Sequence, residues 1–501
     1  MSMEGQAPRK VVFIVIDGMR TDAFEQAAAS GHAPALAFLR QRGRYVRDSV
    51  ATFPSITPAA TATLITGEVP ARHGIPGMCW YDRDEQRFVN YGQSRQVAMR
   101  EGADQVVEDF LVYMNHHHLS KEVRTLHERL HDMGLTSGAI NYLVFRGPYE
   151  HEVNPGVLEK VLFRGALPEK ISGPKEHYFA DMVKGPADAG SKRKRSRGLE
   201  RHVRLNDKWA ADVTRDLLEQ DACDMILFYL HENDHLSHEQ GVHTQVDNLV
   251  AAGEHIGYVL DTFGSWEQTA ERVGFVLTAD HAQSPVANDK EHVIDFDEVL
   301  ADFSRIEPGK GPDPFDGKDL AVAGNGRAAF IYAAPGRRDE LVEPVVKAVL
   351  QSPGVDQAMW REGDAYLVDS NRGRVRFRPV QSGGVVDERG NRWEVEGELQ
   401  SVDCIVEEGE IRTPEYPMAM WRIRSALDLD RIGDLVVTMK VTYDCDDLSD
   451  ENHQGGGDHA SLHAQDSLIP FLSTLGEPPL HPLAVDVAPH ILGHFQRIRS
   501  G

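Results

Sequence analysis

The sequence predicts an α/β fold: a mainly parallel central sheet with helices on both faces, plus an inserted, smaller α+β cap module. The run Val11–Ile16 is apolar and β-branched, as is typical of a strand covered on both faces. Similar runs recur along the chain, each after an amphipathic helical pattern, and this alternation indicates a parallel sheet. Between about residues 300 and 430 the pattern changes to short strands around one helix.

The helix–strand pattern repeats three times after the first strand. The segment KEVRTLHERLHDMGL precedes the strand TSGAINYLVF, and its helical face carries Val123, Leu126, Leu130 and Met133. In the same way KWAADVTRDLLEQ precedes DMILFYL, and VDNLVAAGEHIGYVLDTF precedes VGFVLTAD. In parallel sheets of this kind, ligands bind at the carboxyl ends of the strands.

The change of pattern suggests where the domains divide. We expect residues 1–300 to form the first part of the core, with an excursion near 150–200. Residues 301–430, with GRAAFIYAA, AYLV and VRFRP, are expected to form the inserted cap module. RIGDLVVTMKV and the closing helix VDVAPHILGHF return to core-like sequence, so residues 431–501 are expected to complete the core.

Charge and hydropathy argue against a general nucleic-acid binder and against a membrane-spanning protein. The 501 residues carry a formal net charge of −25, whereas a general nucleic-acid binder is expected to present a basic surface. The basic run SKRKRSRG is interpreted as a solvated loop, with an anion-recruiting patch as the alternative. Apolar runs are shorter than the ~18 residues of a membrane-spanning helix, so we expect none.

The cysteines and the N-terminal stretch indicate a compartment. Cys79, Cys223, Cys404 and Cys445 are scattered, which predicts neither a disulfide framework nor a cysteine-based zinc site. The first apolar stretch stops at Asp17, too short for a signal peptide. We therefore expect the reducing cytoplasm. The sequence does not indicate an oligomeric state.

Three acidic residues each follow a different predicted strand. Asp17 follows Val11–Ile16, Asp234 follows MILFYL, and Asp280 follows VGFVLT. A single Asp at a strand end is usually a cap or turn former. Three at one sheet edge, with His238 and His281 close by in sequence, indicate a metal site instead. Carboxylate and imidazole ligands suit zinc, manganese or iron, whereas magnesium prefers mostly oxygen.

The four-residue spacing from Asp234 to His238 brings both side chains to one ion if the segment is helical. One more histidine is needed to complete a three-ligand site. His459 follows a glycine run that allows close backbone approach, and His463 is the reserve candidate. Three histidines in the loop around His238 stay open as alternatives to it: His231, His235 and His243.

The stretch PSITPAATATLITGEVPARHGIPG, residues 54–77, reads as a helix between two turns. Thr57 stands directly before Pro58, which predicts that it caps the helix N-terminus. A hydroxyl there faces unpaired backbone N–H groups and the positive end of the helix dipole, both of which favour a bound anion.

With these segments in place, the chain resembles the alkaline phosphatase superfamily, particularly its type I phosphodiesterase/nucleotide pyrophosphatase branch. The matching landmarks are VIDGMR, the stretch 54–77, DHLSH, TADHAQ and GGGDHASLHAQDSLIPFL. They span nearly the whole chain, and the 300–430 segment carries none of them.

The resemblance implies two divalent metal ions, with zinc expected and manganese or magnesium as alternatives. One ion would bind Asp234, His238 and His459, and the other Asp17, Asp280 and His281. The family nucleophile lies nine residues before a Thr-Gly pair, and counting back from Thr66-Gly67 gives Thr57, whose hydroxyl would also contact metal. Thr52 is the competitor, because family members often show Thr-Phe-Pro and this chain reads ATFPS.

One position departs from the family pattern. The phosphodiesterases commonly show His-Gly-Ile-x-Gly-Asn, in which the Asn donates to a phosphate oxygen, whereas this chain has Met78 in the Asn position. A thioether cannot donate a hydrogen bond. Asn141 and Arg146 are candidate replacement donors.

The sequence therefore predicts a metal-dependent hydrolase of phosphate diesters or nucleotide pyrophosphate bonds, acting on a small phosphoryl substrate through a phospho-threonine intermediate. A phosphomonoesterase or a phosphonate hydrolase on the same scaffold is the alternative. A non-catalytic phosphate- or nucleic-acid-binding protein is the alternative from another class. A sulfatase is not expected, because the Cys-x-Pro-x-Arg segment of that class is absent.

Overall fold

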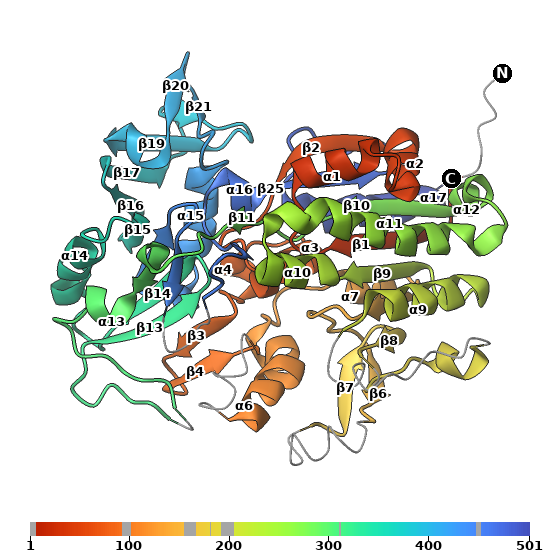
Figure 1. The fold of residues 1–501 in the computed structure, drawn as a ribbon, viewed down its shortest axis with the longest axis horizontal. Coiled ribbons are helices and arrows are strands. Elements are labelled where there is room, and N and C mark those ends of the chain that lie inside the picture. Colours follow the sequence, from red (N-terminus) through yellow and green to blue (C-terminus); the bar gives the residue numbers. More distant parts are fainter. Residues whose placement is uncertain are drawn as a thin grey trace.

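The computed structural model describes residues 7–92, 102–154, 167–180, 182–191, 205–309, 312–446 and 452–500. Two large sheets organise the molecule, and Figure 1 shows the first on the right and the second on the left. The first sheet has seven strands in the order β2-β25-β10-β1-β9-β5-β8. Their bounds are β1 Lys10–Ile16, β2 Arg44–Val50, β5 Ser137–Ile140, β8 Glu176–Tyr178, β9 Met225–Leu230, β10 Val273–Thr278 and β25 Leu468–Ser473.

The first sheet is mostly parallel. β1 pairs in parallel with β9 and β10, and β5 pairs in parallel with β8 and β9. Only β25 runs the other way, between β10 and β2. The predicted mixed α/β fold with a mainly parallel central sheet is therefore confirmed.

Alternate side chains of β1 explain why helices cover both faces of this sheet. Val11, Phe13 and Val15 are buried on one face, and Val12, Ile14 and Ile16 on the other. The first face packs on α3 Thr57–Thr66, α7 Leu126–Asp132 and α17 Val487–Ser500. The second packs on α1 Thr21–Ala29, α2 Pro34–Arg42, α9 Asp207–Glu219, α11 Gln245–Leu260 and α12 Trp266–Arg272.

The three predicted helix–strand repeats correspond to α7 and β5, α9 and β9, and α11 with β10. In the first, the helix begins later than the apolar pattern indicates. Thr125 and Glu128 form a reciprocal capping box that starts α7 at Leu126, so Val123 lies in the preceding turn.

The second sheet has ten strands in the order β13-β14-β22-β15-β16-β17-β19-β18-β21-β20. Its pairings are antiparallel except for β18 with β21. The bounds are β13 Leu320–Asn325, β14 Ala328–Ala333, β15 Val355–Glu362, β16 Ala365–Ser370, β17 Gly373–Pro379, β18 Val385–Val386, β19 Arg392–Gly397, β20 Ile405–Glu407, β21 Glu410–Arg412 and β22 Leu435–Met439.

The two sheets share a hydrophobic core. α14, Arg338–Val349, covers one face of the second sheet. From its other face Ala323, Phe330 and Tyr332 join the same buried cluster as Val11 and Phe13 of β1. The helix α15, Ala419–Leu427, lies in this shared core.

β22 differs from the expected division of the chain. The segment RIGDLVVTMKV is expected to return to the core domain, but its strand pairs between β14 and β15 of the second sheet. Its apolar residues would be compatible with a strand in either sheet. Which sheet it joins depends on pairing with distant strands, and the local sequence pattern does not encode this.

Shorter elements complete the described chain. Two-stranded pairs are β3 Cys79–Asp82 with β4 Arg87–Asn90, β6 Tyr149–Glu152 with β7 Lys170–Gly173, β11 Ser284–Pro285 with β24 Gly457–Asp458, and β12 Val293–Asp295 with β23 Asp444–Asp446. The remaining helices are α4 Pro70–His73, α6 Ala103–Glu108 with a π-helical extension Asp109–His118, α10 Glu232–Gln240, α13 Phe296–Val299 and α16 Ala464–Ser467.

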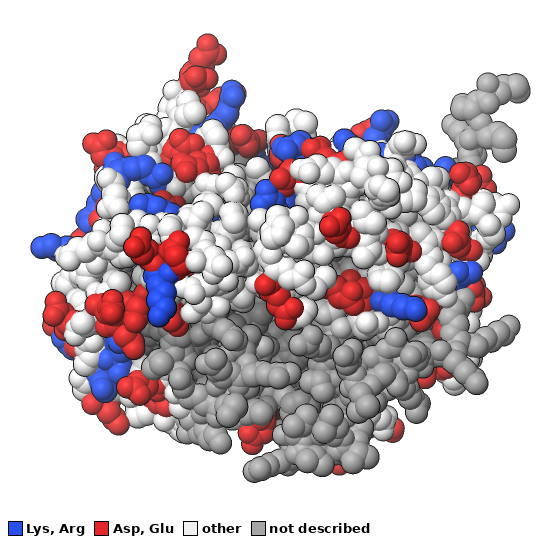
Figure 2. All heavy atoms as spheres, viewed as in Figure 1, with Lys and Arg blue, Asp and Glu red and all other residues white. Residues whose placement is uncertain are grey.

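The surface of the described part of the chain agrees with an acidic protein. On the part of the visible face that Figure 2 colours, acidic side chains are widely spread and basic ones are interleaved among them. Within SKRKRSRG, residues 192–198 lie outside the described residues. Of the helices that the structure describes, none combines the length and apolar character needed to cross a membrane.

Candidate metal centre

The order of the strands brings the three predicted acids together. β1 lies between β9 and β10 and is parallel to both, so the carboxyl ends of these strands are neighbours. Asp17 follows β1 directly, Asp234 lies in α10 just after β9, and Asp280 follows β10 by two residues. The edge at which ligands bind in parallel sheets therefore carries all three carboxylates.

Asp17, Asp280 and His281 form one group of potential ligands, and all three are buried. The His281 Nε2 atom lies 3.4 Å from Asp17 Oδ1 and 3.8 Å from Asp280 Oδ2. Asp17 Oδ1 and Asp280 Oδ2 form no hydrogen bond to any described residue, although both atoms are buried. Buried carboxylate oxygens without donors are costly unless a cation contacts them.

Asp234, His238 and His459 meet beside that group. In α10 the four-residue spacing places His238 Nε2 3.3 Å from Asp234 Oδ2. His459 Nε2 lies 3.8 Å from the other oxygen of Asp234. Asp234, His281 and His459 also lie close enough to be ligands of a common ion.

The histidine rings are oriented as metal ligands require. His281 Nδ1 lies 3.1 Å from the carbonyl of Ala282, and His459 Nδ1 lies 2.9 Å from the carbonyl of Ser55. An Nδ1–H that donates to a carbonyl leaves Nε2 as the lone-pair atom. In both rings Nε2 is the atom that faces the carboxylates.

The spacing of these atoms fits a bound ion. Two ligands about 2.1 Å from an ion at a tetrahedral angle lie about 3.4 Å apart. The nitrogen–oxygen separations of 3.3–3.8 Å match this geometry and exceed ordinary hydrogen bonds. A donor set of carboxylates and imidazoles suits Zn²⁺ or Mn²⁺.

The crowded carboxylates repel one another. Burial and the charges of Asp234 and Asp280 raise the pKa of Asp17 well above its ordinary value, and burial also raises the pKa of Asp280. Burial acts to raise the pKa of Asp234 too, but the imidazoles of His238 and His459 outweigh it and lower that pKa. A cation between the acids relieves this repulsion.

Thr57 faces the first group of ligands. Its Oγ1 atom lies 3.0 Å from His281 Nε2, and the residue is buried. Thr57 is the first residue of α3 and Ile56 is the N-cap, so the prediction that Thr57 caps the helix is wrong by one position. Its hydroxyl points to the metal groups instead of bonding the backbone of its own helix.

The competitor Thr52 lies elsewhere. Its carbonyl accepts a hydrogen bond from Arg422, and its buried hydroxyl has no partner among the described residues. Thr52 is absent from the described wall of the cavity that Thr57 lines. His463 is likewise separate, because it caps α16 and lies 3.5 Å from Glu415.

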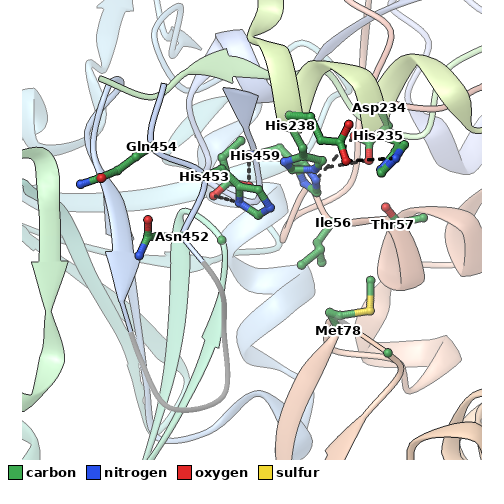
Figure 3. A pocket seen from close by; sticks show the side chains of 14 residues that line it. Ile56, Thr57, Met78, Asp234, His235, His238, Asn452, His453, Gln454 and His459 are labelled. Atoms are coloured by element: carbon green, nitrogen blue, oxygen red, sulfur yellow. Dashed lines mark hydrogen bonds and ion pairs between the residues drawn. The ribbon is translucent and has the colours of Figure 1, made fainter. Parts of the chain in front are cut away.

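A cavity of about 550 Å³ opens in front of these groups. Figure 3 shows His238, His459 and His453 side by side, with Met78 across from them. His235 lines it too and pairs with Glu239 at 3.4 Å, whereas His231 pairs with Asp207 at 3.1 Å. The other lining residues are Ile56, Thr57, Gly92, Asp234, Glu239, Gly326, Asn452, Gln454 and Asp458.

Neither predicted replacement for a donor at position 78 is part of the described cavity wall. The guanidinium of Arg146 donates hydrogen bonds to Glu128 and to the carbonyls of Leu119, Ser120 and Val123. It therefore holds the surrounding loops together and does not face the cavity. Asn141 Oδ1 accepts from Ala180 N at 2.9 Å. Met78 is itself held by its backbone N–H, which donates to Asn325 at the end of β13.

A sequence profile of the type I phosphodiesterase/nucleotide pyrophosphatase family matches residues 11–462. The chain belongs to this family. Comparison with curated proteins gives no match.

Solved structures share the fold of this family member. Murine ectonucleotide pyrophosphatase/phosphodiesterase 5 is 14% identical with a TM-score of 0.55, covering 97% of this chain and 95% of its own. An inactive variant of that protein has been solved in complex with AMP. Phosphonoacetate hydrolase from Sinorhizobium meliloti 1021, in complex with phosphonoformate, is 16% identical with a TM-score of 0.53, covering 97% of this chain and 96% of its own.

Sequence reasoning missed one residue that supports the centre from the second sheet. Arg327, in the turn between β13 and β14, donates its backbone N–H to the carbonyl of His459 at 2.8 Å. Its buried guanidinium pairs with Asp466 at 3.1 Å. Asp466 also accepts hydrogen bonds from Ser284 and Ser461, which ties the loops after β10 and β24 together.

Replacing Arg327 with alanine is expected to lower the free energy of unfolding by about 3 kcal/mol or more, because it leaves the buried Asp466 charge unpaired. Urea denaturation measures the loss. The matched control is Arg378→Ala, which removes an exposed pair with Glu394 and is expected to change stability very little. Equal losses in the two variants would contradict the role given to the buried pair.

Proposed function

We propose that the protein hydrolyses phosphate diesters or nucleotide pyrophosphate bonds, using two bound metal ions and a phospho-threonine intermediate at Thr57. The observation that carries the proposal is the Thr57 hydroxyl, 3.0 Å from His281 Nε2 at the wall of a cavity with two groups of metal ligands. Metal-assisted phosphoryl transfer needs a nucleophilic hydroxyl, ligands for the metal ions and a cavity for the substrate.

Asp17, Asp280 and His281 would hold one ion, and Asp234, His238 and His459 the other. When bound, the ions supply Lewis-acid catalysis and lower the pKa of the hydroxyl and water that react. The start of α3 adds the positive end of a helix dipole beside the phosphoryl group.

The reaction runs in two displacements. The Thr57 oxygen attacks phosphorus, its proton passes to solvent, and the bond from phosphorus to the leaving oxygen breaks. Water then attacks the phospho-threonine, the bond between phosphorus and Oγ1 breaks, and Thr57 regains a proton. Two inversions give net retention at phosphorus.

The second sheet is proposed to act as the cap of this site. Its β13–β14 turn contributes Gly326 to the cavity wall, and Asn325 beside it holds the backbone of Met78. Met78 leaves a substrate without a side-chain hydrogen bond from that position. The structural likeness to phosphonoacetate hydrolase supports a second candidate function, the hydrolysis of phosphonates.

A substrate panel tests the proposal. The protein is reconstituted with Zn²⁺ or Mn²⁺ and assayed on bis(4-nitrophenyl) phosphate, a pyrophosphate-linked dinucleotide, 4-nitrophenyl phosphate and phosphonoacetate. We expect the diester or the dinucleotide to give the highest kcat/KM. A preference for phosphonoacetate would establish the second candidate. Salt-sensitive binding without turnover of any substrate would overturn the enzymatic proposal in favour of a binding protein.

A further inference from the structure

Four histidine rings form a continuous row, and three of them line the cavity: His459, His238 and His453. The ring centroids of His281 and His459 are 3.7 Å apart, those of His459 and His238 are 5.2 Å apart, and those of His238 and His453 are 4.1 Å apart. The first three belong to the proposed pair of ions. His453 continues the row on the side away from Thr57, as Figure 3 shows.

His453 has its own pair of carboxylates. Its Nδ1 atom lies 3.8 Å from Asp444 Oδ2 and 3.9 Å from Asp458 Oδ2. One possible ligand atom from each of the three residues lies within 4.8 Å of the others. His453 Nδ1 is buried and forms no hydrogen bond within the described part of the chain.

These separations resemble those of the proposed pair. They are too long for hydrogen bonds and close to the distance between two ligands of one ion. We propose that Asp444, His453 and Asp458 form a third divalent-cation site on the wall of the same cavity. The site adds to the two-ion function proposed above. Asp458 also lies close enough to His238 and His459 to share an ion with them, whereas Asp444 and His453 are grouped only with each other and Asp458 among the described residues.

Short strands hold the two acids in place. Asp444 begins β23, which pairs with β12, and Asp458 ends β24, which pairs with β11. Asp444 Oδ1 accepts from Cys445 N at 2.8 Å, and its Oδ2 accepts from His453 N at 2.7 Å. These contacts fix the site through the backbone, as a preorganised metal site requires.

A glycine completes the wall. Gly326, with φ of +60°, lies so close to Asp458 that an added Cβ would meet its Oδ1 at 2.6 Å. The carbonyl of Gly326 also accepts a hydrogen bond from the Cys445 thiol. The β13–β14 turn therefore lies against Asp458 and contacts Cys445, the residue next to Asp444.

Charge balance favours a third ion. This region holds five buried or half-buried carboxylates, whereas two divalent ions would supply only four positive charges. The five are Asp17, Asp234, Asp280, Asp444 and Asp458. Arg327 is occupied by Asp466 at 3.1 Å. Asp444 and Asp458 lie within reach of one ion, and a cation between them would offset the repulsion of two neighbouring carboxylates and contact His453 as well.

Metal counting tests the third site. The full chain is stripped by dialysis against EDTA, reloaded with excess Zn²⁺, freed of unbound zinc by gel filtration and analysed by mass spectrometry for zinc per chain. We expect three ions in the wild-type protein and two in both His453→Ala and Asp444→Asn. His292→Ala is the matched control, because His292 pairs with Asp289 at 2.7 Å outside the cavity, and it should keep three.

Two results would overturn the site: two ions in the wild-type protein, or three in His453→Ala. Anomalous diffraction at the zinc edge from wild-type crystals checks the position without any variant, and a peak between Asp444 and Asp458 is expected. A wild-type protein with two ions and full turnover would refute the third site and leave the proposed function standing. One with no bound zinc and no turnover would refute both.

Discussion

Thr57→Ala is expected to reduce kcat on the preferred substrate by about a thousandfold or more while the bound metal remains. The variant removes the attacking oxygen, and loss of a covalent nucleophile ordinarily leaves only the catalysis due to binding and electrostatics. The metal remains because carboxylates and imidazoles supply six other ligands, three for each ion. Steady-state kinetics and metal analysis of the same preparation measure both quantities.

Two variants sharpen this result. Thr57→Ser keeps a hydroxyl at the start of α3 and should retain part of the turnover. Thr52→Ala should behave like the wild-type protein, since Thr52 is absent from the described cavity wall. Acid quenching during turnover, followed by peptide mass spectrometry, should place a phosphate on Thr57. Near-normal activity of Thr57→Ala, with a loss in Thr52→Ala, would move the nucleophile to Thr52.

Removing the metal ions is expected to abolish turnover and to lower the thermal stability of the protein. Each ion that binds only the folded chain stabilises it by about 4 kcal/mol when its free concentration is a thousand times its Kd. The buried charges of Asp17, Asp234 and Asp280 also repel one another once the ions are gone. Differential scanning calorimetry before and after chelation measures the shift, and added Zn²⁺ or Mn²⁺ should restore both properties.

A pair of nearby histidines provides the control for this experiment. His459→Ala should lose one ion and most of the metal-dependent stabilisation at that site. His463→Ala removes a histidine four residues away that caps α16 and faces Glu415, so its metal content should not change. An unchanged melting temperature after complete chelation would argue that these clusters do not hold ions in the folded protein.

The core fold and most of the candidate site follow from local sequence patterns. Runs such as Val11–Ile16 have no polar face, so they can only be buried strands, and parallel strands align the residues that follow them at one edge. This logic brings together Asp17, Asp234 and Asp280, and the structure has them adjacent. The Thr-Pro step gives the start of α3 to within one residue.

What the sequence could not give depends on contacts between distant segments. Asp444 and His453 lie in stretches without helical or long strand periodicity, and they meet Asp458 through the pairing of β23 with β12 and of β24 with β11. Arg327 reads as an ordinary surface cation after a glycine, yet it is fully buried against Asp466. The choice of sheet for β22 has the same origin, because its partner strands β14 and β15 lie far earlier in the chain.

The buried cluster that runs without a break from β1 into Phe330 and Tyr332 has a consequence for how substrates enter and products leave. A domain that moves about a hinge needs a small, polar interface with the rest of the protein. Here the interface between the two sheets is filled by tightly packed apolar side chains. Opening it would expose apolar area on every catalytic cycle. Substrate entry and product release therefore depend on local movements of the cavity rim, and the size of the cavity limits the size of the group that can be cleaved.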